Sequence, residues 1–222
     1  MIYFFADNHF KVRPGQVIYE HLPERLRARI SFSEDDWSVL EQTDWPGDCE
    51  LLILHLIGGS CGNPHPGPEA EKRVRAYLEK GGSTLLLHGS SAAFWQWDWW
   101  RKLPGERWVR PNDPDGCEHS THPKQSCRVT VSKTRHPIAA RLKPMDLVED
   151  EIYIDLENTC PCMRLMETRL ESGTYVQCCE APTPWGGKMV SFIPGHLPVN
   201  TANPVLLENI VTLIDYLCPE GK

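Results

Sequence analysis

Long apolar runs are missing from this sequence of 222 residues. A membrane-spanning helix needs about 20 consecutive apolar residues, and the apolar runs here are far shorter, as in the opening Met1–Ala6. That opening is also shorter than the apolar core of a typical secretory signal peptide. We therefore expect a cytoplasmic protein that has no membrane partner.

Clusters of basic residues are missing as well. The chain has 23 Lys and Arg residues against 30 Asp and Glu residues, a formal net charge of -7, and no stripe of Lys or Arg. Proteins that bind nucleic acid gain affinity when clustered cations release the counterions of the phosphates, so nucleic acid is not an expected partner. Two nucleotide-binding signatures, G-x-G-x-x-G and the Walker loop, are also absent, and neither route to nucleotide binding is expected.

The nine cysteines are spread along the chain, which favours reduced thiols over a disulfide framework. Cys160-Pro161-Cys162 and Cys178-Cys179 lack the two-residue spacer typical of zinc sites, so structural zinc is not favoured there. A denser group of possible ligands lies in a segment rich in Gly and Pro: Cys117, His119, His122 and Cys127. We interpret that group as part of a surface loop, with a metal site as the alternative.

A strand–helix–strand unit is the clearest pattern in the chain. The apolar run Leu51–Ile57 predicts a buried strand, Pro68 suits the first turn of a helix, and Thr84–Leu87 predicts a second strand. Such a crossover places its two strands parallel in one sheet. We expect a single doubly wound α/β domain over residues 1–222, of the flavodoxin-like type, with a mostly parallel central sheet and helices on both faces.

The other expected elements are less sharply bounded. Met1–Ala6 predicts a buried strand, and Asn203 and Pro204 predict the start of a C-terminal helix. Further helices are expected over 16–28, after Ser33 and over 92–103, a long loop over 104–125, and strands near 127–131, 152–154, 163–165, 175–177 and 189–193. The helix over 92–103 would carry five aromatic rings, most of them in the core, with one or two free to stack on a sugar.

His88 is the leading candidate for chemistry, because it directly follows the strand Thr84–Leu87. Ligands of open α/β sheets bind at the carboxyl ends of the parallel strands. His196 follows another apolar strand and is expected at the same edge, where the two imidazoles would suit proton transfer. Together with His9 they would instead suit a divalent metal, and two unrelated loop histidines are the third interpretation. Asp150 and Glu151 offer a carboxylate that orients an imidazole or acts as an acid or base.

Several segments together resemble the ThuA-like (trehalose utilisation) family, whose members resemble the class I glutamine amidotransferase fold. The segments are Gly81–Gly89, His122-Pro123, His136-Pro137-Ile138, Glu149–Tyr153 and Gly187–His196. The resemblance places His88 where amidotransferases keep a nucleophilic cysteine, so glutamine hydrolysis is not expected. It implies His88, Glu151 and His196 as site residues, with His9 and His122 beside them.

The first functional hypothesis is an enzyme that acts on a sugar or an oxidised sugar derivative, of the hydrolase or the isomerase/lyase type. It would use acid/base or metal-assisted chemistry at His88, His196 and Glu151. The metal would be divalent, with zinc as the candidate and His9, His88 and His196 as its candidate ligands. The expected substrate-binding residues are His9, His55, Ser90, Trp95 and His122.

The second hypothesis is a non-catalytic sugar-binding or regulatory module with the same fold, since a fold alone does not define an activity. A metal-storing or redox module built on the cysteines is a third and weaker idea. In the first two cases the partner is a small-molecule carbohydrate, and a homo-oligomer is left open.

Overall fold

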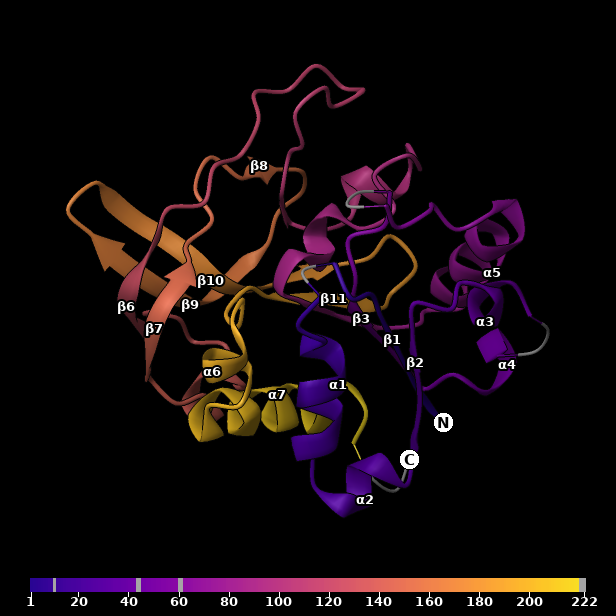
Figure 1. The fold of residues 1–222 in the computed structure, drawn as a ribbon, viewed down its shortest axis with the longest axis horizontal. Coiled ribbons are helices and arrows are strands. Elements are labelled where there is room, and N and C mark those ends of the chain that lie inside the picture. The colour runs from indigo at the N-terminus through magenta and orange to yellow at the C-terminus, as the bar shows by residue number, and fades with distance from the viewer. Residues whose placement is uncertain (10, 43–44, 60–61, 220–222) are drawn as a thin grey trace.

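A mixed β-sheet lies at the centre of the computed structural model, which describes residues 1–9, 11–42, 45–59 and 62–219. Its nine strands follow the order β2-β1-β3-β4-β11-β10-β9-β6-β7 (Figure 1). Their bounds are β1 Ile2–Ala6, β2 Ile30–Glu34, β3 Leu51–His55, β4 Thr84–Leu87, β6 Lys124–Val131, β7 Met145–Glu151, β9 Met163–Leu170, β10 Gly173–Pro182 and β11 Lys188–Phe192. A second sheet pairs β5 (Glu106–Arg107) with β8 (Glu157–Asn158).

The expected parallel sheet is present in one half of the central sheet only. Strands β2, β1, β3, β4 and β11 are parallel, and they include the predicted pairing of β3 with β4. The expectation of a mostly parallel sheet is wrong for β10, β9, β6 and β7, which pair antiparallel. A two-residue connection joins β9 to β10, and such a short turn can join only antiparallel neighbours.

Helices cover both faces of the parallel half. Alternate strand residues such as Phe4 and Ile53 pack in one cluster with apolar residues of α1 (Pro14–His21) and α7 (Pro204–Leu217). Phe5 and Leu54 belong to a second cluster that includes α5 (Pro68–Glu79). Figure 1 shows α1 and α7 together, well separated from α5. This arrangement follows from the alternation of side chains along a strand.

The predicted helix starts at Pro68 and Pro204 are confirmed, since α5 and α7 begin there. The Asn203 side chain caps α7 by accepting the backbone N–H groups of Val205 at 2.9 Å and Leu206 at 3.3 Å. The remaining helices are short: α2 Glu24–Arg27, α3 Ser38–Glu41, α4 Trp45–Asp48 and α6 Pro198–Thr201. No helix within the described ranges is long and apolar enough to cross a membrane.

Two expected elements are wrong, and a third is confirmed only in part. The helix over 16–28 is divided into α1 and α2 at Pro23, because the residue before a proline disfavours helical backbone. Ser33 does not begin a helix but lies in β2. The strand expected over 152–154 is replaced by β7, which ends at Glu151, and Ile154 forms only an isolated bridge with Thr121.

The aromatic segment 92–103 is also not an α-helix. It consists mostly of turns between two short 3-10 helices, η1 (His88–Ala92), which ends at the first residue of the segment, and η2 (Trp100–Lys102). A further 3-10 helix, η3, lies elsewhere in the chain at Ala139–Arg141. Phe94 has a φ of 51°, a left-handed conformation that interrupts an α-helix. Its ring stacks on Trp97 with centroids 4.1 Å apart, so ring packing rather than helical spacing organises this segment, and most of its rings are buried as expected.

Candidate functional site

The site lies at the carboxyl edge of the parallel strands. His88 directly follows β4, and His196 lies four residues beyond β11, which pairs parallel with β4. The sequence prediction that these two histidines share one edge is therefore confirmed. His88 has a φ of 50°, a conformation that is strained for a residue with a side chain and is concentrated at functional turns.

Glu151 reaches the same place from the last position of β7. In hydrogen-bonding order β7 is four strands away from β11, yet the Glu151 carboxylate contacts both His88 and His196. The antiparallel half of the sheet therefore curves back over the carboxyl edge of the parallel half. Long twisted sheets commonly curl in this way.

Three ligand atoms converge at this point. His88 Nε2 lies 3.2 Å from His196 Nδ1 and 3.5 Å from Glu151 Oε2. His196 Nδ1 lies 3.3 Å from the same oxygen of Glu151. All three residues are buried, and within the described part of the chain they form the one group of three or more His, Cys, Asp or Glu side chains close enough to hold a metal ion.

Hydrogen bonds fix the ring of His88 and the backbone of His196. His88 Nδ1 donates to the carbonyl oxygen of Ile193 at 2.9 Å, since a carbonyl can only accept. Its Nε2 atom therefore faces the group, where the Tyr153 hydroxyl lies 3.3 Å away. On the other side, the Asp150 carboxylate accepts the backbone N–H groups of Gly195 at 2.8 Å and His196 at 2.7 Å.

Burial and the contacts among these groups shift their pKa values. Burial lowers the pKa of His88, but Glu151, Asp150 and the Ile193 carbonyl raise it, and the net shift is upward. Burial raises the pKa of Glu151, while His88, His196 and His122 lower it, with a net value of about 2. Burial lowers the pKa of His196 to about 4 although Glu151 opposes it. At neutral pH Glu151 is thus a carboxylate and His196 a neutral ring.

The other oxygen of Glu151 faces two further cations or proton donors. Glu151 Oε1 lies 3.2 Å from His122 Nδ1 and 3.3 Å from Lys124 Nζ. Lys124 Nζ is also 3.2 Å from His196 Nε2. The Glu151 carboxylate therefore connects His88 and His196 to the start of β6.

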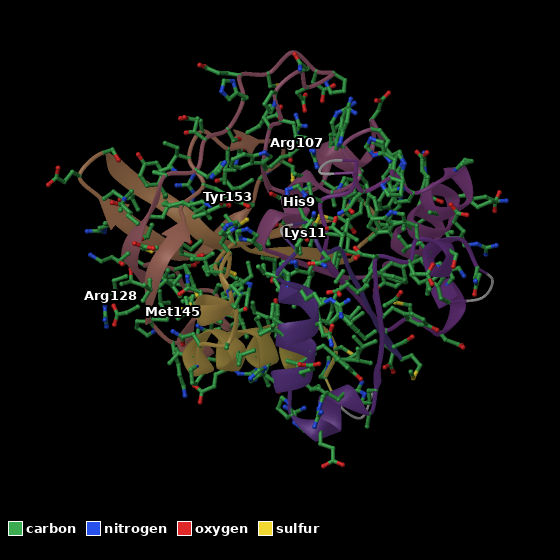
Figure 2. All side chains as sticks on the ribbon, in the orientation of Figure 1. His9, Lys11, Arg107, Arg128, Met145 and Tyr153 are labelled. Atoms are coloured by element: carbon green, nitrogen blue, oxygen red, sulfur yellow. The ribbon has the colours of Figure 1, made fainter. Side chains whose placement is uncertain are left out.

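A cavity of about 620 Å³ lies beside this group, with Glu151 and Tyr153 in its wall, whereas His88 and His196 are not among the residues that line it. Trp95 and Trp108 provide aromatic walls, and His9 and His122 are further polar lining residues. Figure 2 shows His9 and Tyr153 near one another at this edge of the sheet. Burial raises the pKa of Tyr153 well above its usual value, so its hydroxyl keeps a proton to donate.

Arg110 supports the far wall of the cavity. Its guanidinium lies 5.7 Å from the centre of the Trp95 ring and donates to the carbonyl oxygens of Ile57 and Gly58. The indole N–H of Trp95 has no hydrogen-bond partner among the described residues. Trp108 packs against Tyr153 and His122, with ring centroids 4.5 Å and 5.3 Å apart. The wall thus offers aromatic rings, while the indole nitrogen of Trp95 is itself buried.

Two of the expected substrate-binding residues lie behind the cavity rather than in it. The ring of His55 is 6.0 Å from that of His88 and borders only a small void of about 10 Å³. The Ser90 hydroxyl is used within the fold, because it accepts the N–H of Leu56 at 2.9 Å and lies 2.7 Å from the carbonyl oxygen of Leu87. Trp95, His9 and His122, the other residues expected to bind substrate, line the cavity.

The other candidate metal ligands from the sequence are not brought together in this group. His9 lines the cavity, but Glu151 rather than His9 completes the group with His88 and His196. Cys117 instead donates to Glu157 at 3.3 Å, and the cysteines that the structure describes are free thiols. Sequence reasoning missed Lys124, Trp108 and Arg110 as site residues. Tyr153 was detectable, because it lies two positions after Glu151 and every second residue of an extended chain faces the same side.

The central mixed sheet and the helices on both faces of its parallel half make the chain an α/β protein. The sequence profile of ThuA, described as trehalose utilisation, matches residues 30–216. The chain therefore belongs to the ThuA family. Curated proteins show no sequence match to it.

Solved structures agree in fold. A putative ThuA-like protein from Parabacteroides merdae is 13% identical with a TM-score of 0.75, covering 97% of this chain and 88% of that one. Another from Bacteroides uniformis is 12% identical with a TM-score of 0.65, covering 100% and 93%. A cytoplasmic protein from Salmonella typhimurium is 12% identical with a TM-score of 0.59 and full coverage of both chains. At these identities the likeness concerns the fold alone.

Proposed function

We propose that this chain is an enzyme that acts on a carbohydrate at a divalent metal centre formed by His88, Glu151 and His196. The observation that carries the proposal is the set of distances between the three ligand atoms, 3.2, 3.3 and 3.5 Å, at the wall of a cavity with aromatic sides. The family's association with trehalose utilisation supports a sugar as the substrate class.

The donor set fits a zinc-like ion. Metal–ligand distances of about 2.0–2.2 Å in tetrahedral geometry place neighbouring ligand atoms roughly 3.3–3.6 Å apart. Two imidazoles and one carboxylate are also the ligands of a common class of catalytic zinc sites, which keep a further position open. The bond from His88 Nδ1 to the Ile193 carbonyl is the outer contact that ligating histidines typically make. A bound divalent ion would supply Lewis acidity toward a sugar oxygen or a water molecule.

The chain's own residues would bind and orient the sugar. Trp95 and Trp108 line the cavity and would supply aromatic surface for stacking on the apolar face of a pyranose. The Tyr153 hydroxyl next to His88 would donate a hydrogen bond to a substrate oxygen. His122, which is half exposed and contacts Glu151, would exchange protons between the site and solvent. Such proton transfer would suit either the hydrolysis or the isomerisation of a sugar.

Glutamine hydrolysis is not supported by this site. No cysteine is among the described residues that line the cavity, and no thiolate is available at the turn after β4, where His88 stands. Without an attacking sulfur the covalent route of class I amidotransferases has no nucleophile.

The test is turnover. Purified protein, supplied with zinc, is incubated with disaccharides and their keto derivatives, and products are followed by NMR for the wild type and for His88→Ala. We expect product from the wild type and a loss of at least a hundredfold in His88→Ala. Equal rates in the two proteins would exclude His88 from the chemistry.

A non-catalytic sugar-binding module is the second candidate, favoured by the aromatic residues that line the cavity. Titration calorimetry separates it from an enzyme. Saturable binding of a disaccharide that is recovered unchanged, with and without metal, would support this second candidate over the first.

A further inference from the structure

Building on the proposed metal centre, we propose that Lys124 is a competing cation: its ammonium group holds His196 in a form that cannot bind the metal, and it must leave when the metal enters. Lys124 would then be a positioning residue that acts through His196. Lys124 would set the affinity of the centre for the metal, and its side chain would move when the metal binds.

The placement of Lys124 is built into the sheet. Lys124 and Glu151 are direct partners in the antiparallel pairing of β6 with β7, and side chains of such partners lie on the same face. The Lys124 Nζ atom bridges Glu151 Oε1 at 3.3 Å and His196 Nε2 at 3.2 Å. The ammonium thus contacts two of the three residues of the proposed metal centre.

The contact between Lys124 and His196 decides which nitrogen of the ring carries the proton. An ammonium group has three N–H donors and no lone pair. His196 Nε2 must therefore accept from Lys124, and the single proton of the neutral ring is on Nδ1. That Nδ1–H faces Glu151 Oε2 at 3.3 Å, which is a satisfactory acceptor.

Metal binding needs the opposite arrangement. A ligating imidazole nitrogen offers a lone pair, so His196 Nδ1 would lose its proton and Nε2 would carry it. The Nε2–H would then point at the Lys124 ammonium, donor against donor, at 3.2 Å. One of the two groups has to move.

Lys124 is the group that is free to move. Its side chain is 49% exposed, whereas the side chains of Glu151 and His196 are each 4% exposed. The backbone of His196 is also tied to Asp150 by a 2.7 Å hydrogen bond. A lysine on a four-carbon stem reaches water at little cost, so loading the centre should release Lys124 toward solvent.

The test compares zinc affinity at constant pH and ionic strength, measured by competition with a chromophoric chelator. Variants are Lys124→Met, which keeps the length of the stem without the charge, and Lys124→Arg, which keeps donors and charge. Lys143→Met is the matched control, because Lys143 pairs with Glu208 on an exposed surface. We expect Lys124→Met to bind zinc at least tenfold more tightly than wild type, Lys124→Arg to stay nearer to wild type, and Lys143→Met to be unchanged. Equal or weaker binding by Lys124→Met would overturn the proposal.

A second readout does not depend on affinity. Long-range 15N–1H NMR of the histidines reports the protonated nitrogen of His196 in metal-free protein. We expect Nδ1–H in the wild type and a shift to Nε2–H on adding zinc. Nε2–H in the metal-free wild type would contradict the role of Lys124 even if zinc binds. Failure of every variant to bind zinc would instead refute the metal centre.

Discussion

The Asp150 carboxylate holds the backbone of His196, whose N–H it accepts at 2.7 Å, while its other oxygen accepts the N–H of Gly195 at 2.8 Å. Asp150 is 1% exposed, so both bonds are shielded from water. It does not touch either imidazole in this arrangement but fixes the turn from which the His196 ring extends. The neighbouring Glu151 then supplies a carboxylate to the site itself.

Asp150→Asn tests that role. One oxygen becomes an amide N–H that faces a backbone donor, which leaves a buried group unsatisfied and should lower the free energy of unfolding by about 2 kcal/mol. Outer contacts of metal ligands typically contribute tenfold or more to affinity, so zinc binding should weaken by about that factor. Urea denaturation and chelator competition give the two values. Asp146→Asn, at an exposed carboxylate paired with Arg128, is the control and should change neither.

Arg107 supports the loop that carries Trp108 and Arg110. Its guanidinium is 2% exposed and pairs with Asp113, which is fully buried, at 2.6 Å. Arg107→Met would leave that carboxylate without its partner, and such an uncompensated buried charge costs about 3–5 kcal/mol of stability. Arg128→Met removes an exposed pair and should cost less than about 1 kcal/mol. Similar unfolding midpoints for the two variants would show that the Arg107 pair is not structural.

The aromatic walls predict where sugar affinity resides. Trp95→Ala and Trp108→Ala each remove one flat wall of the cavity and should weaken binding of a disaccharide by roughly tenfold, or about 1.4 kcal/mol. Trp185→Ala is the comparison, because Trp185 packs against Trp99 and is not among the lining residues of the cavity. Titration calorimetry measures all three. Unchanged affinity in both cavity variants would place the sugar elsewhere.

His55 predicts a pH dependence of stability that is separate from the metal. Burial lowers its pKa from 6.5 to about 3. Between these two pH values the unfolded chain binds a proton at His55 that the folded chain does not bind. Stability should therefore fall as the pH drops below about 6.5, with a slope of about 1.4 kcal/mol per pH unit down to the folded pKa. In the presence of chelator, urea denaturation of His55→Gln should show a flatter loss between pH 6.5 and 4 than the wild type. Parallel curves would mean that His55 takes up its proton in the folded state.

The sequence predicts the parallel half of the sheet and its histidines because those features are local. The run Leu51–Ile57, the proline at the start of α5 and the run Thr84–Leu87 fix a strand–helix–strand unit. Parallel strands end at one edge, so His88 is expected there, and His196 is expected beside it once its strand is parallel to that of His88.

The rest of the site depends on contacts between distant segments. Glu151 reaches His88 only because β6 and β7 curve back across the sheet, and strand periodicity does not encode that curvature. Lys124 is placed by its pairing with Glu151. The residues of the two strands do not by themselves predict that register. The aromatic segment fails as a predicted helix because packing among Phe94, Trp97 and Trp100 overrides the helical spacing.

Metal content tests the central claim most directly. Protein without a histidine tag is loaded with zinc, desalted and analysed by mass spectrometry of the elements, alongside His88→Ala, Glu151→Gln and His196→Ala. The three ligand atoms at 3.2–3.5 Å predict one zinc per chain in the wild type and little in each variant, with wild-type zinc lost on dialysis against chelator. Zinc that is absent from the wild type, or that remains stoichiometric in all three variants, would contradict a metal centre at this site.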